Sequence, residues 1–159
     1  MRLTIAAALA LLAPSSLSAQ TVAPAAPTPA VDYSVALPIA GGWSYASAAD
    51  GSEATFRDAG ARPQLIVHCA RAARQVTIAK PATGAAPFLY LWTTSLSRSL
   101  PASFNPMTAR LSATLAATDP LLDALAFSLG RVAVTVSGQP PLVVPAWAEV
   151  ARVIEDCRA

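Results

Sequence analysis

The chain has 159 residues, which suits one domain of ordinary size. Apolar residues make up 54% of it, charged residues make up 13%, and the formal net charge is +2. This composition excludes a chain that is disordered throughout, because such chains are poor in apolar residues and rich in charge. Since 37 of the apolar residues are alanine, the others supply one modest hydrophobic core and not two.

Residues 1–19 are typical of a secretory signal peptide. A positive charge at Arg2 precedes an apolar run that only Thr4 interrupts before Ala13, and the small residue Ala19 precedes the expected cleavage site. The run is too short to cross a bilayer as a helix. A buried N-terminal helix is the alternative interpretation. We therefore expect a bacterial periplasmic or secreted protein with no membrane span after cleavage.

Residues 20–40 begin with the sequence QTVAPAAPTPA, whose prolines oppose both a helix and a paired strand. We interpret this stretch as a Pro/Ala-rich linker. Residues 41–159 then form the single predicted domain, which we expect to be rich in β-strands.

Alternation of apolar and polar residues predicts most of the domain as strands. A tight turn is expected at Asp50-Gly51, and a loop over 80–87. The Ser-rich stretch 95–103 either continues a strand or forms a loop. The predicted strands are 43–47, 53–57, 64–69, 75–79, 88–94, 110–116, 131–137 and 142–144.

Two short helices are predicted. Thr118 or Asp119 can cap the first, which has a proline in its first turn and a glycine, Gly130, to end it. Pro145 is expected to open the second helix, whose apolar stripe follows helical spacing: Trp147, Val150, Ala151, Ile154 and Cys157. The predicted fold class is therefore mainly β (α+β), a single antiparallel sheet or sandwich with two short helices, the C-terminal one packed on the sheet.

The two cysteines, Cys69 and Cys157, are expected to form a disulfide, because an even number of cysteines in an exported chain favours pairing. Two buried free thiols are the alternative. His68 lies next to Cys69, but successive side chains of a strand point to opposite faces, so the two cannot share one ion. We predict no metal site and no cofactor.

Motifs for catalysis are scarce. The chain has one histidine, so a catalytic triad would have to use His68. It has no G-x-S-x-G elbow and no glycine-rich phosphate loop. Two pairs of carboxylates are close in sequence, Asp50/Glu53 and Glu155/Asp156, and both are better explained as solvated charges than as an acid and base pair. We predict no catalytic residues and no enzymatic activity.

Charge is distributed unevenly along the chain. Residues 59–118 carry six cations and no acidic residue. One interpretation is that these cations pair with acids from the flanking segments after folding. The other is a basic patch that binds an anionic partner, with Arg71 and Arg74 at the turn between two strands and with Arg62 and Lys80 at the outer ends of the same strands. Nucleic acid is not an expected partner, because the net charge is far below that of a dedicated nucleic-acid binder.

An export signal, Trp43, a strand ending in Cys69, and Cys157 after a short helix follow one another along the chain. This layout resembles small uncharacterised exported proteins of Gram-negative bacteria. More loosely it is similar to the VasI group, associated with type VI secretion, which has a comparable Trp, Cys and Cys order. The resemblance covers residues 43–157. It implies an exported β-rich domain and assigns no functional residue.

Three functions compete at this point. The first is a non-catalytic periplasmic module that binds an envelope protein or anionic polymer through the basic segment. The second is an accessory subunit of an envelope assembly such as a secretion system, with an interface on Phe88–Thr94 or on 95–103. The third is a small hydrolase that uses His68 or a carboxylate pair. We favour the first.

Overall fold

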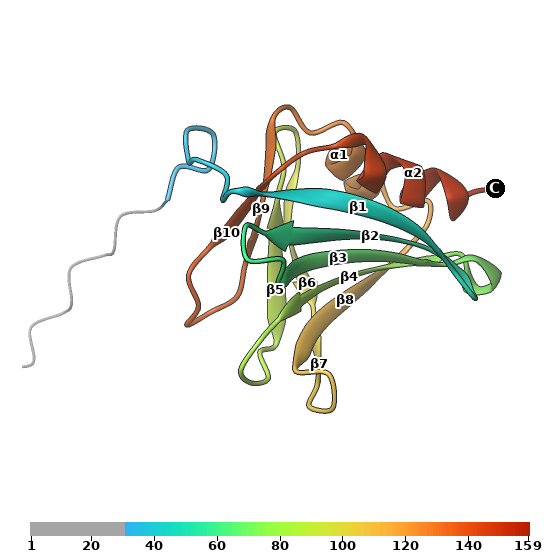
Figure 1. The fold of residues 1–159 in the computed structure, drawn as a ribbon, viewed down its shortest axis with the longest axis horizontal. Helices are drawn as coiled ribbons and strands as arrows, with labels where there is room; N and C mark the ends of the chain where they lie inside the picture. Colours follow the sequence, from blue (N-terminus) through green and yellow to red (C-terminus); the bar gives the residue numbers. More distant parts are fainter. Residues whose placement is uncertain (1–30) are drawn as a thin grey trace, which may run out of the picture. The chain divides into compact units, whose positions relative to one another are not determined.

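The computed structural model describes residues 31–159, which form two antiparallel sheets and two α-helices (Figure 1). The larger sheet contains, in spatial order, β1 (Gly41–Ala48), β2 (Gly51–Asp58), β3 (Pro63–Ala70), β4 (Gln75–Pro81), β8 (Arg110–Ala116) and β7 (Ser103–Asn105). The smaller sheet contains β10 (Leu142–Pro145), β9 (Arg131–Thr135), β5 (Phe88–Trp92) and β6 (Ser97–Pro101). The predicted mainly β fold is confirmed. The predicted signal peptide 1–19 and linker residues 20–30 lie outside the described residues.

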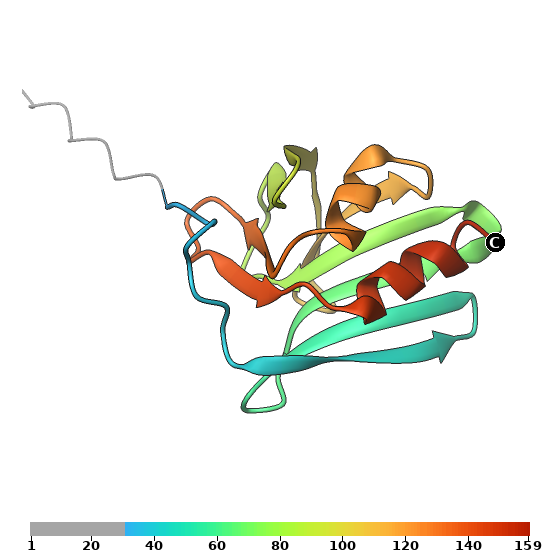
Figure 2. The ribbon, with the colours of Figure 1, turned by 90° about the horizontal axis from the view of Figure 1, so that it is seen from above.

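Two α-helices and one short 3-10 helix complete the fold. They are η1 (Arg71–Ala73), α1 (Pro120–Ala126) and α2 (Ala148–Asp156). The C-terminal helix α2 lies along β1, β2 and β3 with α1 beside it (Figure 2). The predicted packing of the last helix on the sheet is therefore confirmed.

Residues 31–40, the second part of the predicted linker, are bonded to the domain at two points. The backbone amide of Ile39 donates a hydrogen bond to the Val143 carbonyl at 2.9 Å. Arg131 Nη1 donates to the Ala36 carbonyl at 2.6 Å. These two bonds attach the segment to β10 and β9.

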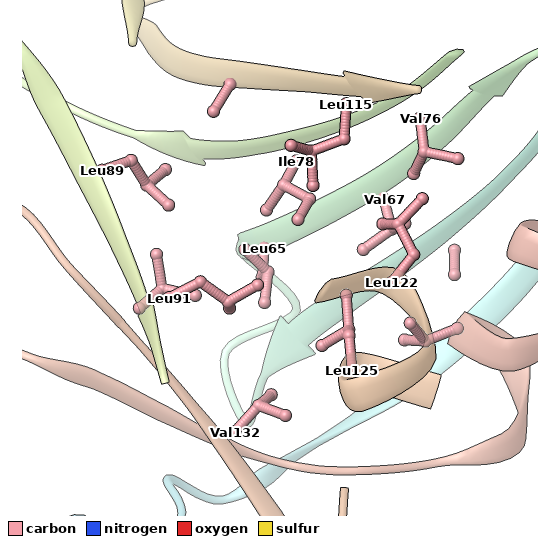
Figure 3. Close-up of a cluster of buried hydrophobic side chains, with 14 of the residues drawn as sticks. Leu65, Val67, Val76, Ile78, Leu89, Leu91, Leu115, Leu122, Leu125 and Val132 are labelled. Carbon is pink, nitrogen blue, oxygen red and sulfur yellow. The ribbon is translucent and has the colours of Figure 1, made fainter. Parts of the chain in front are cut away.

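The core lies between the two sheets and beneath the helices. Strand alternation places Leu65 and Val67 of β3, and Val76 and Ile78 of β4, on the same inner face (Figure 3). Leucines from β5 and from α1 complete the cluster in Figure 3: Leu89, Leu91, Leu122 and Leu125. Their burial supplies the main stabilising term of the fold, on the order of 2 kcal/mol for each large side chain.

The first hairpin turns one residue earlier than predicted. Ala48 pairs with Gly51, so Ala49 and Asp50 form the turn and Gly51 is the first residue of β2. A side chain at Gly51 would collide with the carbonyl of Cys69 on the neighbouring strand β3. Glycine is required here for close strand approach and not for the turn itself.

The second helix also begins later than predicted. Pro145 is the last residue of β10, and α2 starts at Ala148. Val150, Ile154 and Cys157 of the predicted stripe are buried, whereas Trp147 is 47% exposed and Val153, which the stripe did not include, is fully buried. The spacing of the apolar residues was predicted correctly, but the start of the helix was not, because β10 continues through Pro145.

The first helix is shorter than predicted. Asp119 caps it, and its side chain accepts a hydrogen bond from the Leu121 amide at 2.8 Å. The helix ends at Ala126, and Gly130 lies beyond it in the loop with φ +76°. The glycine therefore turns the chain into β9 and does not cap the helix.

Two strand assignments in the middle of the chain are refined. The expected loop 80–87 is shorter, because β4 continues through Lys80 to Pro81. Phe88–Thr94 was expected to be central, and β5 does lie between β6 and β9. Its leucine face is buried, whereas Phe88 on the aromatic face is 53% exposed. The Ser-rich stretch forms the separate strand β6.

The disulfide between Cys69 and Cys157 is confirmed, with a Cα–Cα distance of 5.5 Å. It connects β3 to the C-terminal cap of α2, and both cysteines are fully buried. The bridge closes a separation of 88 residues. The last helix is therefore held to the sheet by a covalent bond as well as by packing.

Candidate functional site

The four cations predicted to form one basic patch lie at two ends of the larger sheet. Arg71 and Arg74 lie at the turn between β3 and β4, whereas Arg62 precedes β3 and Lys80 lies near the end of β4. The eight residues of β3 extend about 25 Å at a strand's usual rise per residue. The structure therefore brings these residues together in two pairs and not in a single patch.

The pair at the turn is partly engaged within the protein. Arg74 has φ +50° and ends η1, and its Nη2 donates to the Arg158 carbonyl at 2.7 Å. This bond holds the C-terminal segment against the turn. Arg71 is exposed. The turn thus offers one solvent-facing cation and one that supports the fold.

The other pair lines a pocket of about 800 Å³ at the opposite end of β3 and β4. Its charged lining consists of two cations, Arg62 and Lys80, and one carboxylate, Asp58, and its neutral polar lining includes Gln64 and Gln139. Its apolar lining comes from residues 39, 81, 82, 109 and 140–142. A largely apolar hollow with a few converging polar groups is the usual form of a small-molecule site.

Lys80 is the unusual residue of this pocket, because it is a cation with an exposed fraction of only 6%. Its Nζ donates to Gln139 Oε1 at 2.6 Å. None of the ion pairs found in residues 31–159 involves Lys80. Burial lowers the pKa of its ammonium group. Because its polar partner is neutral, the positive charge of Lys80 is not balanced and can attract an anion.

Arg62, in contrast, is compensated by an acid. Its Nη2 lies 2.8 Å from Asp58 Oδ2, and its backbone amide donates to Asp58 Oδ1 at 3.0 Å. Gln64 Nε2 donates to the same carboxylate at 2.8 Å. The hydrogen bonds from the amide and guanidinium of Arg62 lower the pKa of Asp58. Since the Arg62 side chain is 78% exposed, it can reorient towards a ligand at the mouth of the pocket.

Pairing with flanking acids explains part of the uneven charge. Asp58 pairs with Arg62, and Asp119 pairs with Arg98 at 2.7 Å. Both acids lie just outside the acid-free segment 59–118. The two interpretations of this segment thus each describe some of its residues.

His68 faces away from Cys69, as the strand geometry predicted. Its Nε2 lies 3.1 Å from Asp50 Oδ2, and its Nδ1 lies 3.8 Å from Glu53 Oε2. The hydrogen bond with His68 lowers the pKa of Asp50. Within residues 31–159, no group of three or more metal-ligating side chains is arranged to hold an ion. The geometry around His68 is that of a surface histidine between two carboxylates.

A second polar cluster was not singled out from the sequence. The Tyr45 hydroxyl donates to Asp156 Oδ2 at 2.7 Å, and the Arg152 guanidinium lies 3.9 Å from the centre of the Tyr45 ring. The expected Cys69–Cys157 bridge could have indicated it. That bridge attaches the end of the last helix to β3, and β3 pairs with β2. Since Ala54 of β2 pairs with Tyr45 of β1, the end of the helix lies within two strands of Tyr45.

Comparison with known proteins found no matching family model, no matching curated relative and no matching solved structure. In the described part of the chain, no helix combines the length and apolar character needed to cross a membrane. Function is therefore argued from the chemistry of the sites.

Proposed function

We propose that this protein is an exported, non-catalytic binding module of the bacterial cell envelope that holds an anionic group of its partner in the pocket around Lys80. The single observation that carries this proposal is the burial of Lys80 with an amide as its polar partner and no carboxylate. An anionic ligand would supply the missing counter-charge, and Arg62 at the mouth would add a second cationic contact.

Two further observations support an exported protein. The N-terminal sequence is typical of a signal peptide. The disulfide is of a kind that persists in oxidising compartments such as the periplasm. Anionic polymers in that compartment carry phosphates, as in lipopolysaccharide, or carboxylates, as in peptidoglycan.

The test is co-sedimentation of the oxidised mature chain, residues 20–159, with insoluble peptidoglycan and, separately, with lipopolysaccharide. We expect retention on one polymer that Lys80→Met abolishes. Arg71→Met is the matched control, because it removes the same charge at the other end of the sheet. No retention on either polymer, or loss with Arg71→Met and not with Lys80→Met, would contradict the pocket as the site.

An accessory subunit of an envelope assembly is the second candidate, and one apolar surface favours it. Phe127 and Leu129 are 75% and 78% exposed. The loop that contains them is bonded to the loop before β6, because the Leu129 amide donates to Thr94 Oγ1 at 3.0 Å and the Thr94 amide to Ser128 Oγ at 3.2 Å. Leu96, in the stretch predicted to form an interface, lies in this second loop and is 38% exposed.

This candidate predicts a complex that survives high salt, because apolar contacts are not screened. Crosslinking in intact cells with a photoreactive residue at Phe127 should capture one defined partner. The same residue at Met107, which is exposed on a different turn, is the control. Equal capture from both positions would argue against a specific interface.

A further inference from the structure

The two sheets have four edge strands, and three of them are poor templates for another strand. β7 has three residues, β6 contains Arg98 and Pro101, and β10 has four residues and ends at Pro145. Short length, charge and proline are the usual protections of a sheet edge. β1 has eight residues, GGWSYASA, with neither a charge nor a proline. It is the exception among the edges of the described fold.

The register of β1 shows which backbone groups face outward. Ala48 and Gly51 pair across a two-residue turn, so they exchange both of their backbone hydrogen bonds. Alternate residues from Ala48 back to Gly42 therefore bond to β2. Those between them, including Tyr45 and Ser47, direct their N–H and C=O groups away from the sheet.

Only the second half of this edge is open. Towards its start, the Ile39 amide bonds to Val143, and Trp43 Nε1 donates to the Pro145 carbonyl at 2.8 Å. Trp147 also lies close to Gly42. Within residues 31–159, β2 is the one strand that is hydrogen-bonded to β1 from Tyr45 to Ala48. An open edge of four residues suits a short extended segment.

A pocket of about 600 Å³ lies beside this open edge. One wall is Tyr45, and the other is the outward side of α2: Ala148, Glu149, Ala151, Arg152 and Glu155. Tyr45 is fixed there by its bond to Asp156 and by the Arg152 guanidinium above its ring. Neither Glu149 nor Glu155 takes part in an ion pair found in residues 31–159. The lining therefore carries two carboxylates against one guanidinium.

We propose that the open edge Tyr45–Ala48 and the pocket between β1 and α2 bind an extended peptide segment by strand addition, with a lysine or arginine side chain in the pocket. An edge strand beside a helix provides both parts of this recognition mode. Main-chain bonds to the strand give affinity, and a pocket that accepts alternate side chains gives specificity. The excess of carboxylates selects a cationic side chain. This surface is separate from the Lys80 pocket.

The test begins with an array of immobilised hexapeptides, each with one fixed residue, probed with the oxidised mature chain, residues 20–159. We expect lysine or arginine to be selected at every second position of the hexapeptide and not at the positions between them, because a strand directs alternate side chains to the same side. The selected peptide is then titrated in solution by fluorescence polarisation. Absence of any position-specific selection would overturn the proposal.

Ser47→Pro is the decisive variant, because it removes an outward N–H that makes no bond within the sheet and proline is tolerated at such positions of an edge strand. We expect at least a tenfold loss of affinity. Ser47→Ala retains the N–H and should bind like the original chain. Equal binding by both variants would overturn the strand-addition mode.

Two more measurements separate the alternatives. Glu149→Gln with Glu155→Gln should reduce the preference for lysine over norleucine about threefold to tenfold, and an unchanged preference would refute the cationic side chain. Sedimentation analysis then tests whether the edge pairs with a second copy instead. If the original chain forms a dimer that Ser47→Pro dissociates, the occupant of the edge is a second copy of the chain and not a peptide.

Discussion

Loss of the Cys69–Cys157 bridge should destabilise this protein more than any single surface change. The bridge restricts the unfolded chain across a separation of 88 residues. In the chain-entropy treatment, a loop of that length corresponds to about 4–5 kcal/mol at 25 °C. For a domain of this size, that difference lowers the melting temperature by roughly 12–25 °C.

The measurement is urea unfolding of the oxidised and the reduced protein, followed by tryptophan fluorescence, to which the buried Trp43 contributes. The reduced protein retains both sulfur atoms in the core, so it isolates the effect of the bond. Cys69→Ala with Cys157→Ala adds the cost of the two small cavities, since both side chains are fully buried. A difference below about 1 kcal/mol between oxidised and reduced protein would refute the reasoning. It would mean that the reduced unfolded chain is already restricted.

Four other changes have expected outcomes. Lys80→Met should leave the free energy of unfolding unchanged or raise it, because the substitution removes a buried cation and retains an apolar stem. Urea titration measures this, and a loss above about 2 kcal/mol would show that the bond to Gln139 dominates. Asp119→Ala should cost about 1–2 kcal/mol through loss of the helix cap, with Asp119→Asn losing less in the same titration. Burial opposes ionisation of Asp119, but hydrogen bonds from Arg98 and a backbone amide outweigh it and lower its pKa. Its stabilising contribution is therefore present above about pH 4 and is lost as the pH falls through the lowered pKa, so Asp119→Asn should flatten the acid limb of the stability curve; an unchanged limb would contradict this assignment. Tyr45→Phe should raise the pKa of Asp156, because the hydrogen bond from Tyr45 is the largest cause of its lowering. An NMR titration of the Asp156 carboxylate measures this, and an unchanged pKa would contradict the prediction.

Much of the fold was predictable because burial and period agree along most strands. The alternation in 64–69 placed Leu65, Val67 and Cys69 on one face, and all three are buried. Register and phase at the ends of elements were less predictable. Pro145 is compatible with the start of a helix and with the end of an edge strand, and packing against β9 decided for the strand. Alternation specifies a residue's face but not where its element ends.

The candidate sites were predictable only in part. Lys80 was recognised as a cation of interest but was placed in a loop. The alternation of Val76 and Ile78 in fact continues to Lys80, and this signal would have placed its side chain on the core face of β4. Arg62 and Lys80 were predicted at the outer ends of the strands, and the eight-residue length of β3 could have shown that they lie too far from the turn arginines to form one patch with them. For the pocket between β1 and α2 the expected Cys69–Cys157 bridge was the one available signal, because the position of a helix across a sheet otherwise depends on contacts distant in sequence.

The position of Lys80 itself favours a binding role over a structural one. Its inward place on β4 continues a line of valine and isoleucine, where another apolar side chain would be buried without the cost of desolvating a charge. The bond to Gln139 offsets part of that cost, and Gln139 lies in the turn before β10 and not within a strand. A buried cation without a counter-charge in the lining of a pocket is the expected signature of a site shaped by its ligand. An anionic ligand should raise the pKa of Lys80 and stabilise the folded chain, and the stabilisation by the ligand should be lost in Lys80→Met.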